Sequence, residues 1–191
     1  LSIIVFEKKV FFNNSIGDIS AIDVDTGRLL WQTPTQDSSI YESAFQLKTS
    51  DLILFKKSIL FSNNKNEFFS INSNNGVLNW KQKINSNLRP VIVDNLLFTV
   101  TMEGFLIVVE SSTGNIIRVT DIFNNFKPKK REIVKPTGFI MGLKNIYLST
   151  NNGRILVIDI ATGKTKSALK IDNEKISRPI VIDKNLLVVK D

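Results

Sequence analysis

The sequence predicts an all-β protein, a propeller of four-stranded antiparallel blades, on three observations. Phe, Ile, Leu and Val are abundant among the 191 residues, and this composition favours strands. A short turn ending in glycine recurs at Gly27, Gly76, Gly114 and Gly163, with spacings of 49, 38 and 49 residues. Each interval contains four short apolar stretches separated by turn residues. Such a repeat is typical of propeller blades; a β-sandwich would explain the strands but not the recurring glycine.

The blades follow one another along a single, partial propeller domain that spans residues 1–191. We expect them at approximately 1–33, 50–84, 89–121 and 136–171. In the third, the strands RPVIV, LLFTVT, FLIVVES and NIIRVTD are separated by DN, MEG and STG. Half a blade follows at 178–191. Because a half-blade leaves strand edges unpaired, about four and a half blades of a larger ring are expected, with the other strands outside this sequence or on another chain.

The recurring turn has a local chemical explanation. The residues before its glycine are small and polar, as in Asp25-Thr26-Gly27, and a polar residue such as Asp23 stands four positions before it. Glycine adopts positive φ readily, and Asp, Asn, Ser and Thr side chains bond nearby amides. We therefore predict a structural role for these acidic residues rather than a ligand-binding one.

The composition excludes several classes of site. The chain has no cysteine and no histidine, which excludes disulfides, thiolate metal sites, a Ser-His-Asp triad and His-based metal centres within it. No apolar run reaches the ~18 residues needed to cross a bilayer. The sequence does not begin with Met and its first residues lack the order of a signal peptide, so we expect a processed chain or a piece of a longer one.

The net charge of +7 favours anionic partners. The alternative is a codon bias towards A and T, because Lys outnumbers Arg 19 to 6.

The first repeat carries the pattern Ala21-x-Asp23-x-x-Thr26-Gly27-x-x-x-Trp31. This form resembles the tryptophan-docking repeat of the PQQ-like (quinoprotein-type) propellers, and the resemblance extends over essentially the whole chain. Trp80 keeps the tryptophan of the second repeat, whereas Arg118 and Ser167 replace it in the third and fourth. The resemblance implies that the tryptophan packs between adjacent blades, with looser docking at the third and fourth.

Two functional classes share this repeat. The quinoprotein dehydrogenases hold pyrroloquinoline quinone (PQQ) and calcium, whereas the BamB-like outer-membrane assembly lipoproteins are non-catalytic scaffolds. A dehydrogenase needs several oxygen ligands for calcium and a carboxylate base, but Asp23, Asp25, Glu110 and Asp159 all belong to the repeated turn. We therefore expect no catalytic residue, no metal and no cofactor. A fragment of a PQQ-dependent dehydrogenase is the alternative.

The resemblance implies a protein-binding scaffold in the periplasm or at the periplasmic face of the bacterial outer membrane. Its partner would be a protein, such as another envelope assembly component, and an anchor in a missing N-terminal segment would attach it to the membrane. A basic, nucleic-acid-binding propeller is a third, less favoured interpretation.

Two long inter-blade segments, residues 34–50 and 122–137, are the candidate binding loops, because long loops on a rigid scaffold are where binding tends to occur. The second carries a basic cluster beside two aromatic residues, suited to an acidic partner surface: Phe123, Phe126, Lys127, Lys129, Lys130 and Arg131. The alternative is a solvated loop with both phenylalanines tucked under the blade.

A second candidate is positional. Arg89, Lys135 and Arg178 each precede a proline that opens an innermost strand. These residues would recur around the mouth of the central channel as a rim that attracts anions or acidic peptides. Alternatively, their side chains bond local carbonyls.

Overall fold

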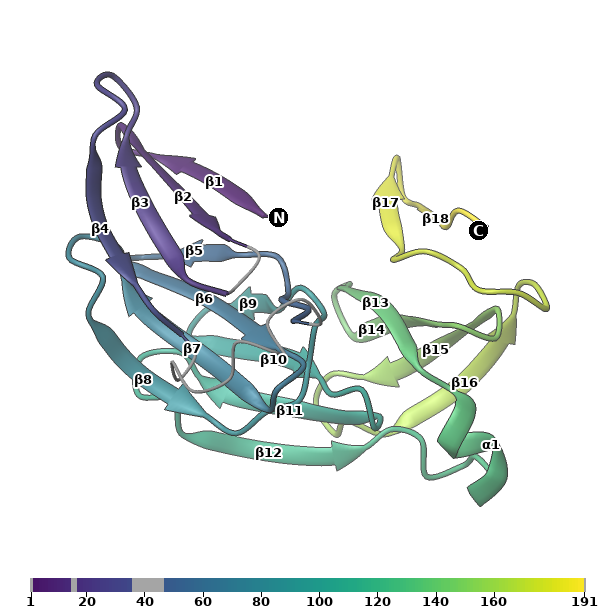
Figure 1. Cartoon of the computed structure of the whole chain (residues 1–191). Helices are drawn as coiled ribbons and strands as arrows, with labels where there is room; N and C mark the ends of the chain where they lie inside the picture. The colour runs from purple at the N-terminus through teal and green to yellow at the C-terminus, as the bar shows by residue number, and fades with distance from the viewer. Residues whose placement is uncertain (1, 15–16, 36–46, 191) are drawn as a thin grey trace. The chain divides into compact units, whose positions relative to one another are not determined.

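The computed structural model describes residues 2–14, 17–35 and 47–190. Within them the chain forms four antiparallel sheets of four strands each, and a two-stranded sheet follows (Figure 1). Sheet 1 contains β1 (Ile3–Phe6), β2 (Lys9–Asn13), β3 (Ile19–Asp23) and β4 (Leu29–Thr33); sheet 2 contains β5 (Ile53–Phe55), β6 (Ser58–Asn63), β7 (Glu67–Asn72) and β8 (Leu78–Gln82). Sheet 3 contains β9 (Val91–Val93), β10 (Leu96–Val100), β11 (Phe105–Glu110) and β12 (Ile116–Asp121); sheet 4 contains β13 (Pro136–Met141), β14 (Asn145–Thr150), β15 (Arg154–Asp159) and β16 (Thr165–Lys170). The half-sheet contains β17 (Ile180–Ile182) and β18 (Asn185–Leu187). The predicted all-β class and the four-stranded meanders are confirmed.

The chain divides into two compact units. Residues 1–90 and 111–114 form unit 1, which holds sheets 1 and 2 together with the β11–β12 turn. Residues 91–110 and 115–191 form unit 2, which holds the strands of sheets 3 and 4 and the half-sheet.

The second and third strands of each sheet supply most of the core. In unit 1, a cluster of buried residues from sheets 1 and 2 includes Phe11, Ile19, Ile59 and Phe61. In β11 the run Leu106–Val109 is buried without interruption. Continuous apolar strands of this kind are buried on both faces.

The recurring glycine closes the turn between the third and fourth strands. Gly27, Gly76, Gly114 and Gly163 have φ values between +68° and +79°, which non-glycine side chains resist. In sheets 1, 2 and 4 the glycine N–H donates to the carbonyl four residues earlier, as from Gly27 to Asp23 at 2.9 Å. The pairing register shifts beside each turn, as between Ala21 and Ile22, which is the geometry of a hairpin with a glycine bulge.

Among the described residues, one helix interrupts the strands. The segment 122–137 was predicted as a long loop, but α1 (Pro128–Ile133) forms within it. Pro128 is at the start, where proline fits because its missing N–H would have no helical partner. The following Lys129, Lys130, Arg131 and Glu132 are good helix formers.

Candidate partner-binding surface

The tryptophans of the first two repeats contact the turn of the next repeat, within unit 1. Trp31 Nε1 donates to the carbonyl of Ser73 at 3.3 Å, and Thr33 Oγ1 donates to that of Gly76 at 2.6 Å. Trp80 Nε1 donates to the carbonyl of Ser111 at 3.0 Å, and two residues later Gln82 Nε2 donates to that of Gly114 at 2.8 Å. The two strand residues four and six positions after each turn glycine therefore bind the following turn.

Arg118 performs the equivalent contact in unit 2. Its Nη2 donates to the carbonyl of Ile160 at 2.7 Å and its Nη1 donates to the carbonyl of Ala161. Both carbonyls belong to the turn that ends at Gly163. The expectation of looser docking at the third repeat therefore needs correction, because a guanidinium supplies the donors that the missing indole would have supplied. Ser167, the equivalent residue of β16, is exposed.

The acidic residues of the turns form local hydrogen bonds. Asp23 Oδ1 accepts bonds from the Thr26 hydroxyl at 2.7 Å and from the Thr26 N–H at 2.8 Å, and these bonds lower the pKa of Asp23. Asp159 accepts the same pair of bonds from Thr162. Its pKa is also lowered, first by Lys166, whose Nζ lies 2.6 Å from Oδ2, and then by Thr162.

A calcium site needs several convergent oxygen ligands. Across the described parts of the chain, no group of three or more Asp, Glu, His or Cys side chains is placed to hold a metal ion. Two of the carboxylates considered for a quinone and calcium site, Asp23 and Asp159, accept local hydrogen bonds within their turns.

Four of the predicted residues in the segment 122–137, which we call the basic segment, anchor α1 on sheet 3. Phe123 is fully buried. Its ring packs directly on Gly104, so closely that a Cβ atom at that glycine would lie 2.2 Å from the ring. Phe126 packs edge-on against Phe123, with ring centroids 5.3 Å apart. Lys130 Nζ lies 5.6 Å from the centre of the Phe126 ring.

Arg131 provides a further anchor. Its Nη1 lies 2.6 Å from Asp121 Oδ2 at the end of β12, and its guanidinium carbon lies 5.4 Å from the centre of the Phe105 ring. An ion pair combined with aromatic contact orients the guanidinium more firmly than a solvated pair would.

Asn151 fastens the other end of the helix. Its Nδ2 donates to the carbonyl of Ile133 at 2.9 Å, and its Oδ1 accepts the N–H of Lys135 at 2.8 Å. Its own N–H donates to the carbonyl of Lys135 at 2.9 Å. Asn151 is not among the residues predicted from the sequence.

We call this pair of bonds between an asparagine and a lysine backbone the asparagine clamp. The sequence does contain a signal for it, because an asparagine stands at the equivalent place in sheet 2. Asn64 holds Lys48 through the same pair of bonds, from Lys48 N–H to its Oδ1 and from its own N–H to the Lys48 carbonyl. Both asparagines directly follow the second strand of a sheet that a long segment precedes. In sheet 3, which a short connection precedes, Met102 stands near the corresponding place.

The anchored helix leaves two lysines and an isoleucine in solvent, and Glu132 is exposed beside them. Lys127, Lys129 and Ile133 are exposed, and the exposed fraction of Ile133 reaches 70%. Lys129 and Ile133 are four residues apart, so they lie on the same face of α1. We call these three residues the α1 surface. Its chemistry suits a partner that offers a carboxylate beside an aliphatic side chain.

The three basic residues before the prolines have different surroundings. Arg178 covers Gly138, whose Cβ would lie 2.4 Å from the Arg178 Cβ, and its Nε donates to the carbonyl of Phe139 at 3.1 Å. Lys135 is exposed in the same unit, and Arg89 is exposed in unit 1. For Arg178, this bond to a nearby carbonyl matches the second of the two predicted interpretations, in which the side chain bonds a local carbonyl.

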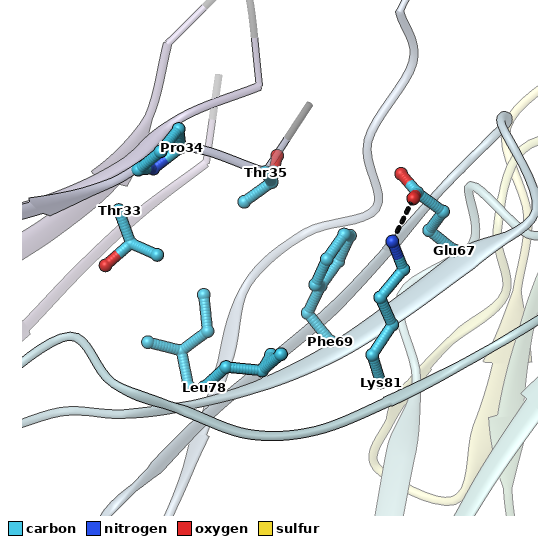
Figure 2. Close-up of a pocket in the computed structure, with 8 residues that line it drawn as sticks. Thr33, Pro34, Thr35, Glu67, Phe69, Leu78 and Lys81 are labelled. Atoms are coloured by element: carbon cyan, nitrogen blue, oxygen red, sulfur yellow. Dashed lines mark hydrogen bonds and ion pairs between the residues drawn. The ribbon is translucent and has the colours of Figure 1, made fainter. Parts of the chain in front are cut away.

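The other candidate segment, 34–50, lies partly outside the described residues. Its first residues border a pocket of about 280 Å³ in unit 1. Figure 2 shows Thr33, Pro34 and Thr35 on one side and Phe69, Leu78 and Lys81 on the other. Lys81 pairs with Glu67 and its Nζ lies 5.2 Å from the centre of the Phe69 ring. The two charges of the lining thus neutralise each other, and the pocket suits an uncharged group.

None of the described helices is both long enough and apolar enough to cross a membrane.

Comparison with solved structures shows the fold. BamB from Moraxella catarrhalis matches with a TM-score of 0.76 and 15% identity over 98% of this chain and 57% of that one. The β-propeller domain of Myceliophteria thermophila Cps50 (Swd1) matches with a TM-score of 0.72 and 11% identity, over 99% and 61% of the two chains. The quinohemoprotein alcohol dehydrogenase of Comamonas testosteroni matches with a TM-score of 0.67 and 13% identity, over 99% of this chain and 39% of that one. The predicted propeller class is confirmed.

The chain thus spans little more than half the length of the BamB structure that it matches. No curated protein matches its sequence. The family model described as outer membrane protein assembly factor BamB matches residues 1–120, which is more than half of the chain. With its recurring glycine turn and docking tryptophans, the chain belongs to this family of PQQ-like repeat propellers.

Proposed function

We propose that this chain is a non-enzymatic binding scaffold and that the α1 surface contacts an acidic face of a partner protein. The observation that supports the proposal is that some residues of the basic segment anchor the helix while others are exposed to solvent. Phe123, Phe126 and Arg131 hold the helix, while Lys127, Lys129 and Ile133 are exposed. A preorganised helix loses little conformational entropy when it binds, which favours affinity.

In its finer form, the proposal is a BamB-like role in outer-membrane protein assembly, at the periplasmic face of the outer membrane. Membership of the family supports this role. The partner would be another protein of the assembly machinery, and no cofactor would be required. Membrane attachment would come from a segment that precedes this sequence.

The α1 surface can be tested with a defined probe. A fluorescein-labelled 12-residue peptide of Asp, Glu and Leu is titrated with the protein while its fluorescence anisotropy is measured. The double variant Lys127→Glu/Lys129→Glu should bind roughly tenfold more weakly, because two attractive contacts become repulsive.

The matched control is Lys57→Glu/Lys65→Glu, which changes the net charge equally at two exposed lysines of unit 1. It should keep most of the affinity. Equal losses in the two double variants would reduce the effect to net charge and would refute the α1 surface as the site. Stronger binding of a dT12 oligonucleotide than of the peptide at the same salt concentration would favour the nucleic-acid interpretation instead.

The alternative, a fragment of a PQQ-dependent dehydrogenase, is tested separately. The protein is titrated with PQQ and calcium, and dye-linked oxidation of an alcohol is measured. The scaffold proposal predicts no turnover above the protein-free mixture, and saturable turnover would overturn it.

A further inference from the structure

A pocket of about 530 Å³ lies between two consecutive sheets of unit 2, sheets 3 and 4, each of which has four strands. Sheet 3 lines it with Val93, Leu96 and Phe98, and with Asp94 in the turn between β9 and β10. Phe98 is 3% exposed, whereas the other three side chains are exposed. The Phe98 ring therefore lies deepest on this side, and the turn forms the rim of the pocket.

Sheet 4 forms the opposite wall. Met141 and Leu143 line the pocket at the turn between β13 and β14, and Ile160 lines it just after β15. Two hydrogen bonds fix the backbone of Ile160. Its N–H donates to the carbonyl of Lys144 at 3.1 Å, and its carbonyl accepts the bond from Arg118 Nη2 at 2.7 Å. This wall is thus preorganised, which lowers the entropic cost of binding a ligand.

The chemistry of the lining is apolar with one carboxylate, as in pockets where a few polar groups orient an apolar ligand. Asp94 is the single charged residue of the lining. In the part of the chain that the structure describes, neither a hydrogen bond nor an ion pair engages its side chain. Lys144 is exposed beside Leu143 but does not line the pocket. The pocket therefore suits an apolar group that carries a cation next to it.

Leu143 indicates the size of the ligand. Its side chain lines the pocket but is fully exposed to solvent. A small molecule enclosed by the walls would leave Leu143 in water, whereas a polypeptide that continues past the rim would cover it. The neighbouring Met141 is flexible enough to adapt to such an occupant.

We propose that this pocket, which we call the sheet 3–4 pocket, is a docking site for a segment of a partner polypeptide with apolar side chains beside a lysine or arginine. The apolar side chains pack on Phe98 and Ile160 and are covered by Leu143, and the cation pairs with Asp94. This chemistry is opposite in charge to that of the α1 surface. The two sites share no residue, so either can fail without the other.

The probe is a fluorescein-labelled peptide, Ser-Gly-Leu-Phe-Arg-Gly-Ser, titrated with the 191-residue protein while anisotropy is measured. A comparison peptide with the same label carries Glu in place of Arg. The net charge of +7 favours the Glu peptide at long range, so tighter binding of the Arg peptide must come from local contacts. We expect saturable binding of the Arg peptide, roughly tenfold weaker binding of the Glu peptide, and slower amide exchange in residues 142–144 with the Arg peptide.

Asp94→Asn tests the carboxylate. Asp94 has a φ of +55°, and asparagine tolerates this left-handed conformation as well as aspartate does. The Arg peptide should bind about three- to fivefold more weakly, because an exposed ion pair contributes modestly. The matched control is Asp183→Asn in the β17–β18 turn, since Asp183 is also exposed and has a φ of +49°. It changes the net charge equally and should leave binding unchanged.

Leu143→Ser tests the apolar rim. It should weaken binding of the Arg peptide roughly tenfold, because the peptide then lacks an aliphatic surface to bury. The matched control is Ile133→Ser, which removes an exposed aliphatic side chain of the α1 surface in the same unit. It should leave binding of the Arg peptide unchanged.

The proposal is overturned if the Arg peptide shows no saturable binding, if the two peptides bind equally, or if either variant behaves like its control. Displacement of the Arg peptide by phenethylamine at concentrations as low as those of the unlabelled peptide would assign the pocket to a small cationic ligand instead. Dimerisation of the protein that Leu143→Ser abolishes would assign it to a second copy of this chain. Both results would also overturn the proposal.

Discussion

Gly76, Gly114 and Gly163 each lie under a side chain of the preceding sheet, and none has room for a Cβ atom. A Cβ would come within 2.6 Å of Trp31 at Gly76, 2.6 Å of Trp80 at Gly114 and 2.5 Å of Thr120 at Gly163. Gly27 has a similar φ of +68° but no heavy atom within 4 Å of such a Cβ. At the scale of single residues, glycine is therefore required for two reasons. All four positions have a left-handed backbone, and three of them also lie too close to a neighbouring side chain for a Cβ atom.

These two requirements can be separated by one pair of variants. Gly27→Ala should lower the free energy of unfolding by about 1 kcal/mol, since only the backbone conformation is penalised. Gly76→Ala should cost a further ~1–3 kcal/mol, because the Cβ also displaces the Trp31 ring. Urea unfolding measures both, and equal losses would contradict the docking role of the glycine.

Arg118 can be tested against Ser167, its counterpart in β16. Arg118→Ala removes the donors to the carbonyls of Ile160 and Ala161 and should cost about 1–3 kcal/mol. Arg118→Trp should restore part of this stability by supplying an indole N–H. Ser167→Ala should change the free energy of unfolding by less than about 0.5 kcal/mol. If Arg118→Ala is as mild as Ser167→Ala in thermal unfolding, the arginine does not dock the turn.

The lowered pKa of Asp159 has a consequence for acid stability. Lys166 and Thr162 stabilise the carboxylate in the folded protein, so the unfolded state takes up the proton first as the pH falls below about 4. The stability contributed by this group is present above that pH and is lost towards the lower, folded-state pKa. Asp159→Asn should therefore reduce the slope of stability against pH between about pH 4 and pH 2. An unchanged slope in urea titrations at several pH values would contradict this account.

At the scale of elements, the strands were predictable because their signals are local. Apolar runs such as Phe105–Glu110 and the polar turns that bound them lie within a few residues of each other. The helix was not predictable in the same way. A six-residue helix such as α1 is marginal alone. Part of its support comes from Asp121 and Asn151, which local sequence patterns do not connect to it.

The candidate site was predicted only in part, because the burial of its residues depends on contacts that are distant in the sequence. Its basic residues were visible in the sequence, but burial divides them into anchors such as Arg131 and exposed residues such as Lys129. Ile133 was not singled out, because the exposure of an aliphatic residue in a loop depends on tertiary packing.

Asn151 is a positioning residue for this element. Asn151→Ala should speed amide exchange in residues 130–135 and weaken binding of the acidic peptide, because the end of α1 loses both side-chain bonds. Asn64→Ala, which removes the equivalent clamp in unit 1, should leave peptide binding unchanged. If Asn151→Ala leaves both exchange and binding unchanged, the clamp does not order the α1 surface.

At the scale of the whole molecule, the repeat explains the fold and the segments between repeats carry the functional proposal. The acidic residues that resemble a small site in the sequence, such as Asp23 and Asp159, are engaged in turn hydrogen bonds. The net charge of +7 attracts acidic partners over distance, while the α1 surface supplies a place for direct contact.

Hydrogen exchange of the 191-residue protein, measured with and without the acidic peptide, shows whether the α1 surface is where the peptide binds. We expect slower exchange in residues 127–135 and unchanged exchange in the turns that end at Gly27, Gly76, Gly114 and Gly163. Protection of those turns, or of residues 34–50 in place of 127–135, would refute the α1 surface as the binding site.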